Sequence, residues 1–404
     1  MKRKITILLF LMLSASIIMM FSCDSKGKSM SFGTTWEWSF HEGLAIVNVG
    51  DKVGFINQAG EMVISPQFDG ACPFSGGFAR VYNSSSNAYM DVKYGFIDKQ
   101  GNRVTDLLFD LAYDFSEGFA LVKVGDRYGF IDKKGNYIAN PQFDDAYGFS
   151  EGLASVMIGG KWGYIDKTGH YYINPQYEKA RSFSKGLAPV SICPNPDRPY
   201  FDRWGYIDKH GNFVIPPVFD DARCFASDGL ARVLFNVGSD WEYNRKWGYV
   251  NNSGEFVILP QFDFAEGFEE GLARIGFGDK YENAKWGYVN KEGRCVVSPQ
   301  FENRFAYFSE GLTAVEIAGR YGYIDNKGKY VINPQFDWTE SFTEGLASVK
   351  VGEKYGFVDR EGRFVINPQF DYAIGFSEGL AAVRLGERLG FINKKGEWVL
   401  DNGK

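Results

Sequence analysis

The sequence predicts an all-β protein built from about ten tandem repeats of 34 residues, each folded as a three-stranded β-meander. The main observation is a phrase, KWGYID at 161–166, that recurs with small changes along the chain. Four of the nine intervals between successive copies are 34 residues long and the others are 35 to 43, so insertions interrupt a 34-residue unit. The composition of 9 Trp, 23 Tyr, 36 Phe and 48 Gly favours strands joined by tight turns. The glycines of the phrase are Gly54, Gly95, Gly129, Gly163, Gly205, Gly248, Gly287, Gly322, Gly356 and Gly390.

One uninterrupted repeat, residues 344–377, shows how each unit is expected to fold. Apolar residues alternate with polar ones in its first half, which is the period of a strand. Two Gly-containing segments have the composition of tight turns, and an Asp before the second can bond the turn backbone. A Pro near the end of the unit cannot donate a ladder hydrogen bond, so it indicates an edge strand or a strand end. The expected strands cover 346–351, 354–359 and 364–370.

The arrangement of the units is expected to be an open, twisted, solenoid-like array. Three short strands cannot bury both faces of a sheet, so each unit must pack on its neighbours. Three strands are few for a propeller blade, and ten blades exceed the usual four to eight. The alternative is a closed β-propeller-like ring, in which the terminal fragments 36–43 and 397–404 would complete one blade. The segment 371–379 is expected to connect units, with at most one turn of helix.

The glycine of the phrase is expected to serve packing. Glycine weakens a strand, so it often marks a close approach by another group. Because an aromatic residue follows the glycine in all ten copies, we expect an aromatic ring from an adjacent strand or unit to fill the space. The clearest signature residues are Trp162, Gly163, Trp204, Gly205, Trp247, Gly248, Trp286 and Gly287.

Three sub-motifs recur in fixed order: the K/R-W/Y-G-Y/F-I/V-D/N phrase, EGLA, and PQF. Together they resemble the WG-repeat, or KWG-repeat, proteins of bacteria, over about residues 36–404. The second copy lacks PQF, and the first and tenth replace the aromatic residue before glycine with Val53 and Leu389. The resemblance implies an exported or surface repeat protein and no defined catalytic activity.

The N-terminus resembles a bacterial lipoprotein signal peptide. Three basic residues precede an apolar stretch, residues 5–21, and a small residue stands before Cys23. The resemblance implies cleavage before Cys23 and attachment of lipid to its thiol, so that lipid alone anchors the protein. An ordinary signal peptide or anchor is the alternative. We therefore expect a signal peptide at 1–22, a lipidated N-terminus and linker at 23–35, and the repeat array at 36–404.

Charge and motif content exclude several functions. Removal of residues 1–22 takes away three basic residues and changes the net charge from −6 to −9, which argues against nucleic acid as a partner. The three histidines fall at different repeat positions, and no nucleophile, Walker or dinucleotide motif is present. Aspartates that end the phrase suggest turn capping more than a calcium site. Cys72, Cys193, Cys224 and Cys295 have no CxxC spacing and are expected to be buried free thiols. We expect no enzyme activity, no metal and no cofactor.

The long insertions indicate where ligand recognition could occur. All four fall between the first and second expected strands, at 82–92, 191–202, 235–245 and 276–284, so they should emerge on one edge of the array. Three belong to consecutive copies and contain aromatic and charged residues, a composition found at binding surfaces. The alternative is that these loops bury their own aromatic residues. The candidate ligand-binding residues are Tyr200, Phe201, Trp241, Tyr243, Phe277 and Tyr281.

The leading functional hypothesis is a lipid-anchored cell-envelope protein that acts as a non-catalytic scaffold for binding another protein or a polysaccharide. It would face the periplasm or the cell surface, at the outer membrane. A purely structural spacer is the alternative, and an enzyme on a propeller, with clustered carboxylates on one face, is a remote third.

Overall fold

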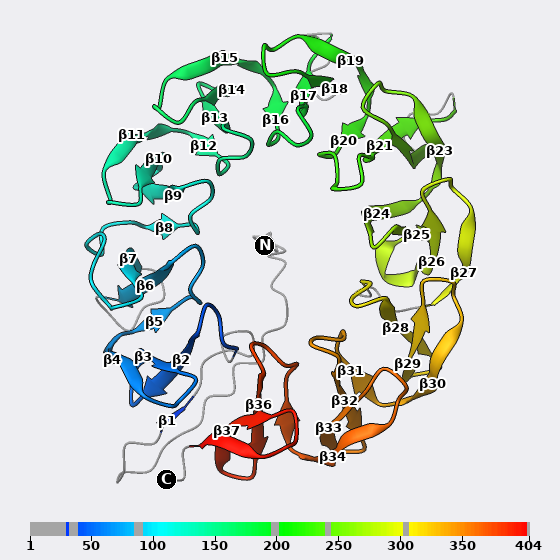
Figure 1. The fold of residues 1–404 in the computed structure, drawn as a ribbon. Coiled ribbons are helices and arrows are strands. Elements are labelled where there is room, and N and C mark those ends of the chain that lie inside the picture. Colours follow the sequence, from blue (N-terminus) through cyan, green and yellow to red (C-terminus); the bar gives the residue numbers. More distant parts are fainter. Residues whose placement is uncertain are drawn as a thin grey trace, which may run out of the picture.

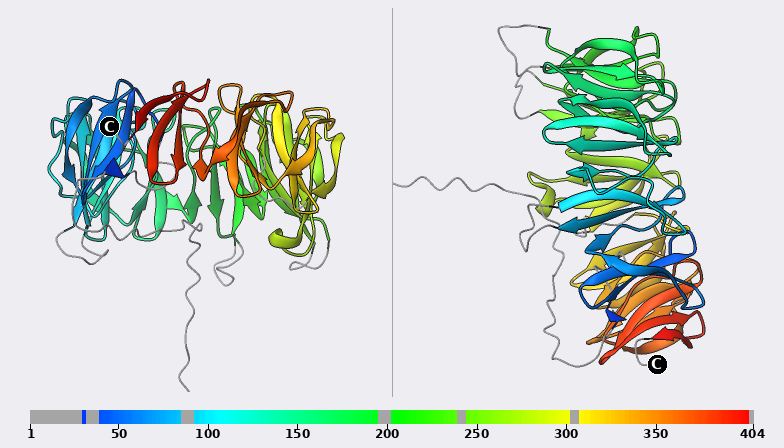
Figure 2. Two further views of the ribbon diagram at one scale, coloured as in Figure 1. Left: turned by 90° about the horizontal axis from the view of Figure 1, so that it is seen from below. Right: turned by 90° about the vertical axis from the view of Figure 1, so that its left-hand side faces the viewer.

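The chain folds into a closed ring of ten small β-sheets in a computed structural model (Figure 1). The structure describes residues 30–31, 39–84, 92–194, 202–238, 244–301 and 307–401. Each sheet is an antiparallel meander whose strands follow the sequence order outward from the inner rim, as in a propeller blade. Figure 2 shows that the strands run between the two faces of a flattened ring.

The first five blades have these strands. Blade 1 contains β1 (Met30–Ser31), β2 (Leu44–Val49), β3 (Lys52–Asn57) and β4 (Met62–Phe68). Blade 2 contains β5 (Gly70–Ala71), β6 (Phe78–Ser84) and β7 (Val92–Asp98). Blade 3 contains β8 (Leu111–Ala112), β9 (Phe119–Val124), β10 (Arg127–Asp132) and β11 (Tyr137–Phe143). Blade 4 contains β12 (Asp145–Ala146), β13 (Ala154–Ile158), β14 (Lys161–Ile165) and β15 (Tyr171–Tyr177). Blade 5 contains β16 (Lys179–Ala180), β17 (Ala188–Ile192), β18 (Arg203–Ile207) and β19 (Phe213–Phe219).

The other five blades complete the ring. Blade 6 contains β20 (Asp221–Ala222), β21 (Ala231–Asn236), β22 (Arg245–Val250) and β23 (Phe256–Phe262). Blade 7 contains β24 (Phe264–Glu269), β25 (Leu272–Phe277), β26 (Lys285–Asn290) and β27 (Cys295–Phe301). Blade 8 contains β28 (Leu312–Ile317), β29 (Arg320–Asp325) and β30 (Tyr330–Phe336). Blade 9 contains β31 (Trp338–Thr339), β32 (Ala347–Val351), β33 (Lys354–Val358) and β34 (Phe364–Phe370). Blade 10 contains β35 (Tyr372–Ala373), β36 (Leu380–Leu385), β37 (Arg388–Asn393) and β38 (Trp398–Asp401).

Helix is nearly absent, as expected. Within the described ranges the single helix is the three-residue 3₁₀ helix η1 (Tyr281–Asn283), and no helix there is long and apolar enough to cross a membrane.

Most blades have a fourth strand that the sequence analysis missed. The segment predicted to connect units, with one helical turn, instead begins a blade with a two-residue strand at the inner rim. In blade 4 this strand is β12, where Asp145 pairs with Met157 and Ala146 with Val156. A type I′ turn follows, and its residues Glu151 and Gly152 both have positive φ. The expected three-stranded unit was therefore wrong, because two residues are too short to show an alternating pattern.

The glycine of the phrase accommodates backbone and not an aromatic ring. On the outer strand of blade 4, residues 174–176 lie opposite Gly163 alone, because Trp162 pairs with Tyr177 and Tyr164 with Ile173. A Cβ on Gly163 would lie 2.5 Å from the Ile173 carbonyl oxygen and 2.6 Å from the next proline nitrogen. The ring expected above each glycine was therefore wrong. The proline lies in this bulge of an edge strand, as predicted.

Neighbouring blades are joined by a repeated polar contact. The glutamate of each EG turn is in the left-handed region, which costs a non-glycine residue about 1–2 kcal/mol. Its carboxylate accepts a hydrogen bond from the corresponding glycine N–H of the next blade, a charge-assisted bond that offsets the strain. Seven of the ten interfaces have this bond: Glu42 to Gly77, Glu117 to Gly152, Glu151 to Gly186, Glu270 to Gly311, Glu310 to Gly345, Glu344 to Gly379 and Glu378 to Gly43.

The ring closes between blades 10 and 1 with the same contacts. Gly43 N–H donates to the Glu378 carboxylate at 2.9 Å, and the Ser377 hydroxyl donates to the Phe40 carbonyl at 2.8 Å. Phe40 is fully buried, with its ring 4.9 Å from that of Phe391, in a core that both blades share. The expected open solenoid-like array was therefore wrong, and the alternative closed ring is correct. The terminal fragments do not share a blade: each belongs to its own.

Closure makes a testable difference between interfaces that are otherwise alike. The double variant Phe40→Ala/Glu378→Ala removes the ring contact and the carboxylate at the closing interface, where no peptide bond joins the blades. We expect a loss of roughly 3–5 kcal/mol from the phenylalanine alone and a larger radius of gyration by small-angle X-ray scattering. The matched control, Phe376→Ala/Glu344→Ala, removes the same contacts between blades 9 and 10, which the chain still connects. An equal radius for both variants would contradict closure at this interface.

Candidate functional site

The repeat phrase serves the blade interfaces. In blade 4, Lys161 forms an ion pair with Glu178, and the Tyr164 hydroxyl donates to the Arg181 carbonyl of blade 5 at 2.8 Å. Of the signature tryptophans, Trp162, Trp204 and Trp286 are buried and Trp247 is half-buried. A ligand in solution therefore meets little of the phrase, and the site must be sought where blades differ.

The aspartates that end the phrase cap the following turns, as predicted. The Asp166 carboxylate accepts bonds from the Thr168 N–H at 2.8 Å and the His170 N–H at 3.2 Å. A hydrogen bond from the Thr168 hydroxyl, with these backbone bonds, holds the pKa of Asp166 below its usual range. In the described ranges, no three His, Cys, Asp or Glu residues are grouped so that they could hold a metal ion.

The blades differ in charge at the inner rim. In blades 2 to 7, 9 and 10, a phenylalanine lies at or just after the inner strand. The residue two positions before it is aromatic, basic, acidic or apolar in different blades. These residues, in chain order, are Cys72, Tyr113, Tyr147, Arg181, Arg223, Glu266, Glu340 and Ile374. Because this position adjoins the innermost strand, it borders the inner side of the ring (Figure 1).

Arginines gather on the rim of blades 5 to 7, and we call Arg181, Arg223, Arg232 and Arg274 the arginine rim. Arg181 and Arg223 follow the inner strands β16 and β20, whereas Arg232 and Arg274 lie on the adjacent strands β21 and β25. Each guanidinium lies over a signature tryptophan, an arrangement with cation–π attraction. The carbon-to-centroid distances are 4.8 Å for Arg181 over Trp204, 5.9 Å for Arg223 and 5.6 Å for Arg232 over Trp247, and 4.3 Å for Arg274 over Trp286.

Two carboxylates pair with these four cations. Asp221 lies 3.2 Å from an Arg181 nitrogen and 3.0 Å from an Arg223 nitrogen. Glu266 contacts Arg232 at 2.6 Å and Arg274 at 3.9 Å. Burial, with smaller effects from Arg181 and Arg232, lowers the pKa of Arg223. Glu269 also lies close enough to Arg274 for an electrostatic effect, so four cations face three carboxylates and the group has one excess positive charge.

Arg274 is the most buried of the four, with 2% of its side chain exposed. It donates to the Tyr281 hydroxyl at 3.0 Å, but its Nε and Nη1 have no hydrogen-bond partner among the described residues. The Nε atoms of Arg181 and Arg223 also lack one there. Buried donors without acceptors are unfavourable in a protein that has only to fold. Together with its charge, this feature makes the arginine rim the candidate functional site.

The insertions predicted to bind ligand occur in the same blades. Their flanking strands, such as β17 and β18, form equivalent hairpins, so these strands end on one face of the ring (Figure 2). Phe277 is 40% exposed, with its ring 5.8 Å from that of Phe262. Tyr281 lies in η1, its ring 4.8 Å from that of Trp286. The other four candidates, Tyr200, Phe201, Trp241 and Tyr243, lie outside the described residues.

Sequence reasoning missed the arginine rim although a signal was present. Arg181 and Arg223 lie two residues before a phenylalanine, in a segment that was interpreted as a connection between units. Arg232 and Arg274 follow the sequence Gly-Leu-Ala, where other copies have a small or apolar residue. In most other blades these positions are uncharged. A comparison of the copies by charge at each position would have found the cluster.

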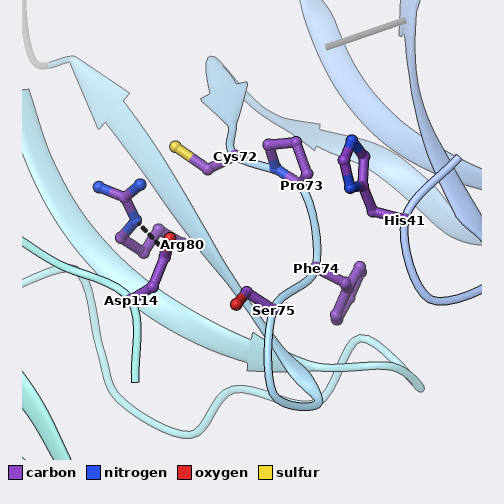
Figure 3. A pocket seen from close by; sticks show the side chains of 7 residues that line it. All are labelled: His41, Cys72, Pro73, Phe74, Ser75, Arg80 and Asp114. Atoms are coloured by element: carbon purple, nitrogen blue, oxygen red, sulfur yellow. Dashed lines mark hydrogen bonds and ion pairs between the residues drawn. The ribbon is translucent and has the colours of Figure 1, made fainter. Parts of the chain in front are cut away.

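A cavity of about 340 Å³ lies in the inner rim of blades 1 to 3 (Figure 3). Arg80 corresponds to Arg232, but its single positive charge is balanced by one carboxylate. It donates to Asp114 at 2.7 Å and to the Ala112 carbonyl at 2.8 Å, so this part of the rim has no excess charge. The lining residues are His41, Cys72, Pro73, Phe74, Ser75, Arg80 and Asp114. Neither Cys72 nor the three other described cysteines forms a disulfide; three are partly buried and Cys295 is exposed, less buried than predicted.

Comparisons with known proteins agree with the repeat pattern. The profile of a family described as "WG containing repeat" matches residues 54–84, 94–128, 128–162, 162–192, 204–236, 247–281, 286–321, 321–355 and 355–388. No curated protein matches the chain.

Similar solved structures support the fold alone. One titled "Crystal structure of the eukaryotic initiation factor" is 12% identical with a TM-score of 0.51, covering 84% of this chain and 95% of that chain. Kluyveromyces lactis Hsv2p is 12% identical with a TM-score of 0.33, covering 65% and 93%. PorZ, described as a bacterial surface component of the type-IX secretion system of Porphyromonas gingivalis, is 8% identical with a TM-score of 0.31, covering 92% and 59%. The last two are too distant to support an argument.

Glu340 gives the rim of blade 9 an acidic group in place of arginine. Its carboxylate accepts a hydrogen bond from the Gly375 N–H of blade 10 at 2.7 Å. Burial raises its pKa from 4.5 to about 7, against the smaller opposite effect of this bond. The folded protein therefore holds this proton more tightly than the unfolded chain, and stability falls as the pH rises from about 4.5 to 7.

The variant Glu340→Gln removes this titration while keeping an acceptor for Gly375. We expect its midpoint of thermal unfolding to exceed that of the wild type by roughly 1–3 °C at pH 8 and by less at pH 5, where the native carboxyl is protonated. Differential scanning calorimetry at both pH values measures the difference. A difference that is the same at pH 5 and pH 8 would show that the carboxyl does not titrate in this range.

Proposed function

The chain belongs to the WG-repeat family, and we propose that it is a non-catalytic binding scaffold held at the bacterial cell envelope by a lipid anchor. Its ligand is a protein or polysaccharide of the envelope, and its recognition surface is the arginine rim with the insertions of blades 5 to 7. The observation that carries the proposal is the contrast between blades. The shared residues are occupied by blade interfaces, whereas the arginine rim differs from the rest and has buried donors without acceptors.

The geometry of a rigid ring supports recognition by a surface. Side chains that are already held in place by packing and by hydrogen bonds or ion pairs lose little conformational entropy on binding. The guanidiniums of the arginine rim are held in this way, because each lies over a tryptophan ring and each contacts Asp221 or Glu266. Such preorganisation favours binding without any change in the ring.

The N-terminal sequence supports the location. Lys2, Arg3 and Lys4 precede the apolar residues 5–21, and Cys23 follows one small residue later. A lipid on Cys23 anchors the protein through buried methylene groups, while the residues between Cys23 and β1 separate the anchor from the ring. Residues 1–29, which include Cys23, lie outside the described residues.

Trimming of the insertions tests the binding surface. In one variant of the full chain, residues 195–201 and 239–243 are replaced by Gly-Gly, the turn that blade 4 has at 159–160. We expect at least a tenfold weaker apparent Kd for solubilised envelope fractions, because the surface beside the arginine rim is lost. The matched control replaces residues 85–91 of the equivalent hairpin in blade 2 and should bind as the wild type. If both variants bind as well as the wild type, the insertions are not part of the recognition surface. If nothing binds, including the wild type, the protein is a spacer and the binding proposal fails.

Replacement of the predicted lipidation site tests the anchor. In cells labelled with radioactive palmitate, we expect the wild-type chain to incorporate label and to sediment with membranes. The variant Cys23→Ser should lose the label and leave the membrane fraction, whereas Cys295→Ser, an exposed thiol in the ring, should behave as the wild type. Sedimentation of unlabelled Cys23→Ser with membranes would show that the N-terminal segment anchors the protein without lipid.

A further inference from the structure

We propose that the ligand is an acidic polysaccharide, whose uronate carboxylates bind the arginine rim and whose sugar rings stack on exposed tyrosines of the neighbouring blades. This inference rests on the proposed binding function and names the chemistry of its ligand.

The charge of the rim selects for anions. Arg181, Arg223 and Arg232 are 27%, 39% and 24% exposed, so a ligand can reach them, while Arg274 lies beneath. With Asp221, Glu266 and Glu269 counted, three carboxylates face four guanidiniums, so the cluster is positive in a chain whose net charge is −6. The electrostatic attraction of a ligand carboxylate is strengthened because half-buried charges are screened less by water and salt.

The guanidiniums also have unused donor capacity. Each has five N–H donors in a planar fork that fits a carboxylate with two bonds. Asp221 is the one acceptor that the described residues provide to the side chains of both Arg181 and Arg223. The contacts with the Trp204 and Trp247 rings use none of these N–H groups. A carboxylate from solution therefore meets donors that are already oriented.

Exposed aromatic rings flank the arginine rim. Tyr147 of blade 4 is 47% exposed, with its ring stacked at 5.3 Å on Trp162. Tyr113 of blade 3 is 46% exposed, and Tyr307 of blade 8 is 44% exposed and lies 5.4 Å from Arg274. The hydroxyl end and apolar face of a tyrosine suit a surface that is partly wet. The apolar face of a pyranose ring, formed by its C–H bonds, stacks on such a face.

This combination favours a polysaccharide over an acidic protein. A protein partner is held mainly by side chains that enter fully desolvated pockets, whereas the rim presents open tyrosine faces between cations. The groups also recur on successive blades at one structural position, as Tyr147, Arg181 and Arg223 do. A polymer that repeats one acidic sugar presents carboxylates and ring faces at regular intervals, which matches such a rim.

Isothermal titration of the full chain with polygalacturonate oligomers tests the inference. We expect saturable binding that weakens at least tenfold between 50 and 300 mM salt and is lost when the carboxyl groups of the oligomers are reduced to alcohols. The variant Arg181→Gln/Arg223→Gln should bind at least tenfold more weakly, and Tyr147→Ala several-fold more weakly. The control Arg80→Gln, whose native guanidinium is engaged by Asp114 on the same rim, should bind as the wild type.

Poly-glutamate of equal charge is the competing probe. If it binds as tightly as polygalacturonate, and Tyr147→Ala has no effect on either, the rim selects charge alone and the inference is overturned. Thermal unfolding of each variant shows whether its ring is intact, and Arg181→Lys/Arg223→Lys, which keeps the charge, provides a second variant with intermediate affinity expected. If envelope fractions bind the protein but polygalacturonate does not, the ligand chemistry is wrong and the binding function stands. If neither binds, both fail.

Discussion

The close passage of the outer strand over the glycine of the repeat phrase is the constraint on which the ring depends. Three residues of the outer strand lie opposite one glycine, so Ile173 and Tyr177 both enter the interface with the next blade, while residues 174–176 stay at the surface. Any side chain on Gly163 would meet backbone atoms at about 2.5 Å, and backbone cannot move aside as a side chain can. The glycine thereby lets one short strand place large residues on both sides of the bulge, and the blade gains enough buried surface to need no further layer.

The other contacts extend this local arrangement around the ring. The tyrosine after the glycine donates to a backbone carbonyl of the next blade, as Tyr164 does to Arg181. The lysine at the start of the phrase, Lys161, pairs with Glu178, which follows the outer strand. The glutamate of a left-handed turn accepts a hydrogen bond from the glycine N–H of the corresponding turn in the next blade. The second oxygen of the acid that follows the outer strand also accepts a hydrogen bond from the next blade, as Asp371 does from Gly386. Each blade therefore specifies the position of its successor. Closure requires only that blade 10 contact blade 1 as any blade contacts the next. The hydrogen bond from Gly43 to Glu378 and the core shared by the two blades provide this contact.

Much of the blade could be predicted from sequence, because its signals are local. The predicted strands 346–351, 354–359 and 364–370 correspond to β32, β33 and β34 within one residue at each end, and the turn aspartates have the expected capping role. Two features escaped for physical reasons. The inner strand β35 has two residues, and no alternation exists over that length. The choice between a solenoid and a ring depends on the angle between blades, which arises from the packing of many side chains and leaves no period in the sequence. The same limit applied to the site, since Arg181, Arg223, Arg232 and Arg274 are distant in sequence and meet only because blades stack.

In a repeat protein, the residues that stabilise the fold and the residues that are free to differ between copies occupy different positions of the repeat. The arginine rim lies at positions of the second kind. Residues that every blade requires are buried at interfaces, so a mutation there changes stability first. At one inner-rim position the contact shared by the blades is made by the backbone. Its carbonyl accepts the tyrosine hydroxyl of the preceding blade whether the side chain is Arg181, Arg223 or Glu340. The type of side chain there therefore varies between blades, although Glu340 is itself partly buried and Ile374 is buried. Arg181 and Arg223 occupy that position, and Arg232 and Arg274 a nearby one that tolerates Ser155 or Ala382, so the cations are placed where the fold needs no particular residue. Nothing in the repeat requires their excess charge, which supports the binding role proposed for them.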